Sequence, residues 1–426
     1  MKARPIESSW NISFPLPSRP LLQRVGLNTL WLFLARIFSQ ALMIVFTALI
    51  ARRLGAAGLG QFAFIASAVY LGNMFTTFGM DTLLIREVAR THNPATPLIP
   101  AAFRIQIVFS AILVAAVFVG ADTAGNSAET LLALKLYSLA LFPLAFFTLF
   151  SAVLRAYERM DVFLVLSIAS ALLQTAGALI VFATGAGLTT LIYFLLAAQT
   201  AAAFLSAVLC YSYIPGFAFL WRIQRGELTS IARRAAPFAA LVALGVLYQR
   251  IGVLILPALA GDATTGWFSA AARIVESMKI APQALLGALF PVLAHRLHRG
   301  QESRLARSAL RISLGLGALA ALVVSVTAQP LTDLIYGSGF AASITALQVL
   351  AWALIPYAFT ANVALELVAR GREGSVLKGN LIGVLFALVL FLILVPAYGL
   401  LGASWAVVGS EWVQAGIFYF IRRASA

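Results

Sequence analysis

The chain has 426 residues, of which 62% are hydrophobic and only 11% are charged, and it carries a net charge of +15. Soluble globular proteins are nearer half apolar and a quarter charged, so this composition excludes a water-soluble protein and indicates a membrane protein. Because the basic residues lie in short groups, they form no nucleic-acid surface; the single cysteine, Cys210, excludes an internal disulfide, and the three histidines form no pattern that could bind a metal.

The first 26 residues are polar and basic, and they lack the apolar stretch and cleavage site of a signal peptide. We therefore expect residues 1–26 to form a cytoplasmic tail that leads into an uncleaved first span. A bilayer core about 30 Å thick needs about 20 apolar residues per helix, so the apolar runs that follow predict an all-α fold of about twelve transmembrane helices. These runs cover residues 27–51, 60–80, 101–121, 131–153, 161–184, 189–213, 235–258, 265–293, 312–332, 342–368, 379–396 and 400–421.

Basic residues outside the predicted spans indicate how the chain is oriented in the membrane. Lys and Arg concentrate in the two ends and in every second loop, whereas the intervening loops hold only Arg52, Arg53 and Lys135. By the positive-inside rule, both ends of the chain lie in the cytoplasm. The external loops are all short, so they offer no domain that could hold the acceptor and catalytic groups of an enzyme. We therefore expect the protein not to be an enzyme.

Two pairs of segments suggest that the first six spans are repeated by the last six. The sequence LGAAGLGQFAFIASA (54–68) resembles LAGDATTGWFSAAAR (259–273), with Gly60 and Gly266 at an offset of 206 positions. A shorter match pairs residues 154–156 with residues 369–371. Because each half has an even number of spans, we expect the two halves to have the same orientation, with a cavity between spans 1, 2, 7 and 8.

This repeat predicts the domain organisation of the chain. We expect one six-helix bundle over residues 27–213 and a second over residues 235–421. The basic segment 214–234 is the predicted cytoplasmic linker between them, and residues 422–426 form the cytoplasmic C-terminus.

The eighth predicted span carries three ionisable residues, which are rare in transmembrane helices. Arg273, Glu276 and Lys279 are spaced by three positions, so they line one helix face, where Glu276 can partly neutralise both neighbours. A charge at the bilayer centre costs about 2.5–3.5 kcal/mol on insertion scales, so this face is expected to contact protein or water. The alternative to a functional site is an internal ion triad that fixes helix packing.

Two further arginines occupy corresponding helices of the two halves. Arg36 lies in span 1 with Gln40 one turn further on, and Arg250 lies deep in span 7. The alternative for Arg36 is that it extends to the lipid headgroups. A cavity lined by Arg36, Arg250, Arg273 and Lys279 would hold four cations against the carboxylate of Glu276. Such a cavity suits phosphate or pyrophosphate, which arginine binds in a bidentate manner.

One acid of the last span is a candidate for coupling transport to an ion gradient. Glu411 has the apolar neighbours Val407, Val408 and Trp412 and no basic residue within a helical turn. Glu276, by contrast, is expected to be held ionised by its two basic neighbours. We therefore expect Glu411 to be the group whose protonation biases the two access states. The alternative is a solvated residue in a water-filled crevice.

Four segments of the chain carry a family resemblance: GWFSAAARIVESMKIAPQALLGALFPVLA (266–294), ARRLGAAGLGQFAF (51–64), FGMDTLLIREVAR (78–90) and ARIFSQ (35–40). They resemble the Wzx-type polysaccharide flippases of the multidrug/oligosaccharidyl-lipid/polysaccharide (MOP) exporter superfamily. The resemblance implies a flippase that moves undecaprenyl-diphosphate-linked sugar units across the bacterial inner membrane by alternating access, for O-antigen or exopolysaccharide synthesis. It also implies that polysaccharide polymerases and glycosyltransferases are partners and that no cofactor is needed.

The resemblance extends to some of the candidate site residues. Arg36 and Arg273 match arginine positions of the family. Arg250 and Lys279, in contrast, are assigned from the cavity argument and not from the family pattern.

Two other functions remain as alternatives to a flippase. A drug or cation antiporter of the same superfamily needs carboxylates in its cavity, and spans 1 and 2 contain none before Asp81. A membrane glycosyltransferase needs paired carboxylates or a cluster of acids that binds a metal, and the external acids of this chain are scattered singly.

Overall fold

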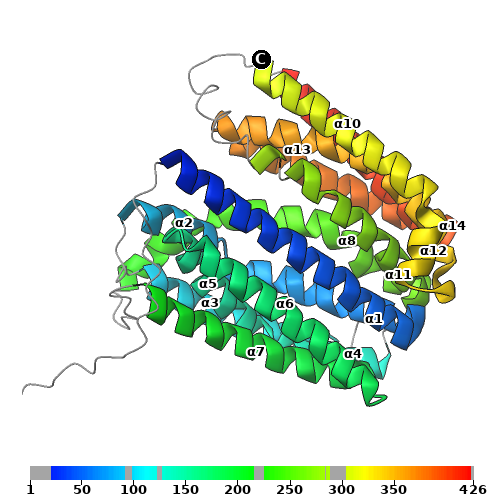
Figure 1. Ribbon diagram of the computed structural model, residues 1–426, viewed down its shortest axis with the longest axis horizontal. Coiled ribbons are helices and arrows are strands. Elements are labelled where there is room, and N and C mark those ends of the chain that lie inside the picture. The colour runs from blue at the N-terminus through cyan, green and yellow to red at the C-terminus, as the bar shows by residue number, and fades with distance from the viewer. Residues whose placement is uncertain are drawn as a thin grey trace, which may run out of the picture.

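The computed structural model describes residues 21–91, 98–121, 127–214, 225–283, 285–287 and 304–423, and these residues are almost entirely helical, with no strand among them (Figure 1). The predicted all-α fold is confirmed. The α-helices are α1 (Leu21–Thr77), α2 (Met80–Thr91), α3 (Leu98–Gly120), α4 (Ala128–Ser138), α5 (Leu141–Ala156), α6 (Met160–Ala183), α7 (Leu188–Tyr213), α8 (Arg225–Met278), α10 (Arg304–Val326), α11 (Ala328–Ile335), α12 (Ala342–Ala351), α13 (Leu354–Ala369) and α14 (Glu373–Arg423). A short 3₁₀ helix, η2 (Ser338–Phe340), connects α11 and α12.

Helices α1, α8 and α14 are each long enough for two crossings of a membrane, and each contains one glycine with non-helical backbone angles. Gly55 has φ 69° and ψ −169°, Gly261 has φ 82° and ψ 171°, and Gly399 has φ 53° and ψ −124°. Residues with a side chain rarely adopt a positive φ, so glycine allows the chain to reverse direction there. The turns predicted at residues 55–58 and 260–262 are therefore reversals between consecutive spans.

The number of membrane crossings follows from the lengths of these helices. Within the described residues, eight helical segments are long and apolar enough to cross a membrane, and α12 with α13, bent by 41°, makes nine. Three of these nine, α1, α8 and α14, each supply a second crossing, which gives twelve, six before and six after the predicted linker. The protein is a multi-pass membrane protein with about the number of spans that the sequence predicts.

The ends of several predicted segments differ from those of the observed helices, most clearly at the tail and at the linker. Helix α1 begins at Leu21, six positions before the predicted first span, and residues 1–20 of the predicted tail lie outside the described residues. Helix α8 begins at Arg225, inside the predicted linker 214–234, so the second part of that segment is helical. The first part, residues 215–224, also lies outside the described residues.

The Gly55 and Gly261 turns contact each other, which shows how the two halves are related. A Cβ atom added at Gly60 would overlap the carbonyl oxygen of Asp262, and one added at Gly266 would overlap that of Ala56. Residues 56 and 60 become residues 262 and 266 at the offset of 206, so the two contacts are equivalent under exchange of the halves. Equivalent turns that touch lie on the same side of the membrane. The repeat is therefore parallel, as predicted.

Helices α5 and α13 give a second pair of equivalent segments. Both have 16 residues, and they begin with the similar sequences LFPLAF and LIPYAF, at an offset of 213. This alignment pairs Leu154 with Leu367, so the predicted match of residues 154–156 with residues 369–371 is wrong by two positions. The similarity of short Ala- and Leu-rich stretches misplaced it, whereas the proline near each helix start fixes the register.

Helices α1 to α7 form one group and α8 to α14 form the other, and α1 and α8 lie along their boundary (Figure 1). The largest hydrophobic core is shared by both groups and includes Phe46 and Phe62 of α1 together with Leu256 and Phe268 of α8. Two smaller cores belong to the opposite end of the helices. One lies around α2, α3 and α5 and includes Ile231 and Ala235 of α8, and the other lies around α13 and α14. The halves are therefore joined by the large core toward the glycine turns and also, through α2 and the start of α8, at the other end.

Candidate functional site

A cavity of about 850 Å³ lies between the two halves. Its walls come from α1 and α8, which form the predicted spans 1, 2, 7 and 8, and also from α4 to α7 and α12 to α14. All seven residues predicted for the site line this cavity: Arg36, Gln40, Arg250, Arg273, Glu276, Lys279 and Glu411.

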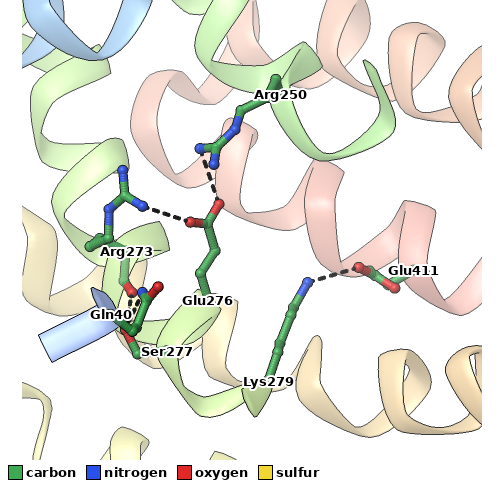
Figure 2. Close-up of polar contacts among 7 residues, drawn as sticks. All are labelled: Gln40, Arg250, Arg273, Glu276, Ser277, Lys279 and Glu411. Atoms are coloured by element: carbon green, nitrogen blue, oxygen red, sulfur yellow. Dashed lines mark hydrogen bonds and ion pairs between the residues drawn. The ribbon is translucent and has the colours of Figure 1, made fainter. Parts of the chain in front are cut away.

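Glu276 binds two arginines that come from the two spans of α8 (Figure 2). Its Oε1 atom lies 3.3 Å from Nη1 of Arg250, and its Oε2 atom lies 3.3 Å from Nη1 of Arg273. The carboxylate therefore stands between the two guanidinium groups and joins the helix before the Gly261 turn to the helix after it. The three side chains are between 18% and 28% exposed, so the cluster is open to water in the cavity.

Lys279 lines the same cavity as Arg273 and Glu276, as predicted, but its ion pair is with Glu411 and not with Glu276. Its Nζ atom lies 3.4 Å from Oε1 of Glu411 on α14, and Figure 2 shows the side chain pointing away from Glu276. The reason is local: α8 ends at Met278, and the backbone N–H of Lys279 donates to the carbonyl of Glu276 in a tighter turn. Lys279 therefore lies just beyond the regular helix, where its side chain reaches Glu411 of α14.

Glu411 consequently has a basic partner on another helix, and its predicted ion-coupling role stays a prediction. Its side chain is only 5% exposed, and the Lys279 ammonium supplies the opposite charge. This ammonium also lies 4.2 Å from the centre of the Tyr357 ring, which adds a cation–π contact. Glu411 does lack a basic neighbour on its own helix, but its partner comes from a position 132 residues earlier in the chain.

Arg36 and Gln40 bring α1 to the same cavity. Gln40 donates from Nε2 to Oγ of Ser277 over 2.9 Å, and this Oγ donates to the carbonyl of Arg273 over 2.8 Å. Arg36 is exposed and has no ion-pair partner among the residues that the structure describes. Since Arg36 lines the cavity, its charge is available to an anion there.

Sequence reasoning missed the aromatic residues that pack against the cations. The guanidinium of Arg250 lies 5.5 Å from the centre of the Tyr70 ring on α1, a contact that joins the two halves. The repeat offset could have found this residue, because Tyr70 is the equivalent of Glu276 in the first half. Tyr357 gives no comparable signal in the sequence.

The charged residues give the cavity a positive balance. Among the described lining residues, four cations face two carboxylates, and one of these carboxylates is nearly buried with Lys279. The described residues contain no group of three His, Cys, Asp or Glu side chains that could hold a metal ion. The arrangement suits a ligand with negative charge, bound by guanidinium groups.

A sequence profile of the polysaccharide biosynthesis protein family matches residues 25–297, which is more than half of the chain. The chain belongs to the polysaccharide biosynthesis protein family. This assignment confirms the family resemblance of the sequence. No curated protein sequence matches the chain.

Solved structures show which fold this family member has. An inward-facing multidrug resistance MATE family transporter of the MOP superfamily aligns with a TM-score of 0.72 and 15% identity over 96% of this chain and 98% of the other. The lipid II flippase MurJ, in an inward closed conformation, aligns with a TM-score of 0.72 and 14% identity over 92% of this chain and 87% of the other. A MOP superfamily transporter from Pyrococcus furiosus aligns with a TM-score of 0.68 and 15% identity over 95% of each chain. At such identities the likeness establishes the fold, which is that of the MOP superfamily.

Proposed function

We propose that this protein is a flippase that moves undecaprenyl-diphosphate-linked oligosaccharides across the bacterial inner membrane for surface polysaccharide synthesis. The observation that carries the proposal is the pair of arginines, Arg250 and Arg273, that converge on one carboxylate in a cavity between two membrane-embedded halves. Family membership supplies the pathway, and the cavity supplies the chemistry of the ligand.

The cluster is suited to a diphosphate because the two guanidinium groups already bind a group of similar shape. Glu276 presents two oxygen atoms, one to each arginine, much as a phosphate would. A guanidinium forms paired hydrogen bonds with carboxylate and phosphate alike. An incoming diphosphate carries more charge than one carboxylate, so it displaces Glu276 from the arginines. Glu276 thus holds the anion site in place when the cavity is empty, and Arg36 adds a further cation.

Alternating access requires that the contacts at the glycine turns open while those at the other end close. At the glycine turns the two halves are held together by backbone packing at Gly60 and Gly266, by a hydrogen bond of 3.1 Å from Gln61 to Asp262, and by Arg52. The Arg52 guanidinium donates to the carbonyl oxygens of Leu334 and Ile335 in the other half. These contacts join the two halves and would have to be exchanged for others as access alternates.

The orientation follows from the charge of the loops. The positive-inside rule predicts that both ends of the chain lie in the cytoplasm, so the glycine turns would face the periplasm. Substrate would then enter on the side where glycosyltransferases assemble it and leave on the side where a polymerase uses it. These enzymes are the proposed partners, together with the membrane lipids around the protein.

The competing proposal is a drug or cation antiporter of the same superfamily. A cationic substrate would need an unneutralised carboxylate in the cavity. Glu276 is held by two arginines and Glu411 by Lys279, and four cations outnumber the two acids among the described lining residues. The electrostatics of the cavity therefore favour the anionic lipid.

The proposal is tested by measuring flipping in proteoliposomes that contain undecaprenyl-diphosphate-N-acetylglucosamine. A membrane-impermeant galactosyltransferase labels only the sugars on the outer leaflet, so a flippase increases the fraction of lipid that becomes labelled. We expect the purified protein to give this increase and Arg273→Ala to abolish it. Equal labelling with and without the wild-type protein, for this lipid and for the lipid-linked oligosaccharide of the source cells, would contradict the proposal.

A further inference from the structure

The two walls of the cavity differ in chemistry although they are built from equivalent positions. At the offset of 206 that relates the Gly60 and Gly266 contacts, three charged residues in the second span of α8 correspond to uncharged polar residues of α1. Both sets line the same cavity. Arg273, Glu276 and Lys279 correspond in this way to Ser67, Tyr70 and Asn73.

Further neutral polar groups extend the first-half wall across α5, α6 and α7. These lining residues are Thr148, Ser167, Ser170, Gln174, Thr175 and Gln199. Gln174 donates from Nε2 to the hydroxyl oxygen of Ser170 over 3.3 Å, and Gln199 shares a hydrogen bond with Tyr137. Among the described lining residues of α1 to α7, Arg36 is the only one that carries a charge.

Such a wall suits a neutral ligand that has many hydroxyl groups. Serine, threonine and tyrosine hydroxyls both donate and accept, and the amides of asparagine and glutamine do the same through separate atoms. A sugar hydroxyl that enters an apolar site loses its bonds to water, whereas a site of this kind replaces them. The cavity volume of about 850 Å³ lies within the usual range for sites that bind ligands of drug size.

We infer that the wall formed by Ser67, Asn73, Gln174 and their neighbours binds the sugar of the lipid-linked substrate and sets which sugars the protein accepts, while the α8 cations bind its diphosphate. The inference rests on the proposed function. It assigns the two parts of one ligand to the two halves of the repeat. Tyr70 joins the two subsites, because it lies on the neutral wall and packs against Arg250.

The test compares the binding of lipids with and without a sugar to protein in nanodiscs. The probes are undecaprenyl diphosphate and the same lipid carrying N-acetylglucosamine, glucose or galactose. Gln174→Met and Ser67→Ala remove hydrogen-bonding groups with little change of volume, and Ser212→Ala is a matched control on an exposed helix face outside the cavity. Arg273→Ala perturbs the other wall.

We expect the wild type to bind at least one sugar-bearing lipid more tightly than undecaprenyl diphosphate. Because a hydrogen bond contributes about 1 kcal/mol, Gln174→Met and Ser67→Ala should each reduce this preference about fivefold. Affinity for undecaprenyl diphosphate itself should not change in these variants, which also shows that they are folded. Arg273→Ala should weaken the binding of all four lipids and keep the preference.

Two results would overturn the inference alone. One is a wild type that binds all four lipids equally, and the other is a preference that survives in both Gln174→Met and Ser67→Ala. If Arg273→Ala leaves the affinity for undecaprenyl diphosphate unchanged, the anion site of the proposed function fails instead. The two failures are therefore distinguishable in one set of measurements.

Discussion

Replacing Glu276 with glutamine should make the cavity bind anions more tightly and transport them more slowly. Glutamine keeps the shape of the side chain but removes the negative charge that occupies Arg250 and Arg273, each at 3.3 Å. Partly exposed ion pairs contribute up to about 1 kcal/mol each, so a ligand that displaces two of them loses about 2 kcal/mol. Since 1.4 kcal/mol is a factor of ten, affinity should rise about 30-fold in Glu276→Gln.

Binding of undecaprenyl diphosphate to protein in nanodiscs, followed by thermophoresis, measures this change, and the proteoliposome assay measures the rate of flipping. A ligand that no longer meets a competing carboxylate leaves the site more slowly, so the flipping rate should fall. Glu366→Gln is a matched control, because Glu366 also binds two arginines, Arg370 at 2.6 Å and Arg422 at 3.1 Å, but does not line the cavity. Unchanged or weaker binding in Glu276→Gln would refute the idea that this carboxylate competes with the ligand.

Three further changes test other parts of the account. Lys279→Met leaves Glu411 buried without its partner and should destabilise the protein by about 3 kcal/mol or more in thermal unfolding. The double variant Lys279→Met/Glu411→Leu should recover most of this loss, and a double variant as unstable as the single one would contradict the pairing. Gly60→Ala should loosen the contact between the two glycine turns and increase the rate of amide hydrogen exchange there. Gly245→Ala is the control, because an added Cβ at this position of α8 meets open space, and it should leave the exchange rate unchanged. Equal exchange rates in the two variants would show that the contact does not hold the two turns together. Arg273→Lys should retain only part of the transport that Arg273→Ala abolishes, because an ammonium keeps the positive charge but cannot form the planar paired contact. Both variants should reach wild-type abundance in the membrane, and a matching loss of abundance would favour a structural role.

The spans and the repeat could be predicted because they depend on features that are local in the sequence. Apolar runs of about 20 residues follow from the thickness of the bilayer, and the loop charges separate them clearly. The repeat was visible around Gly60 and Gly266 because two backbones that touch there exclude any side chain, and this restricts both positions to glycine. Where no such contact restricts the sequence, as at residues 154–156, the predicted alignment was wrong.

The partners of the charged residues could be predicted only in part. Helix spacing correctly paired Arg273 with Glu276, which are three positions apart. It failed for Lys279, because the pairing depends on where α8 ends and on a glutamate 132 positions later. Arg250 meets Glu276 across the Gly261 turn, and the angle of that turn cannot be obtained from spacing. Contacts between spans are set by the packing of the whole bundle.

The central claim is that the arginines of α8 bind the diphosphate of a lipid-linked sugar inside the cavity. An electron cryomicroscopy structure of the protein in nanodiscs with undecaprenyl diphosphate tests it most directly. We expect the diphosphate to contact the guanidinium groups of Arg250 and Arg273, with Glu276 displaced from both. A diphosphate bound elsewhere, with both ion pairs of Glu276 intact, would contradict the account.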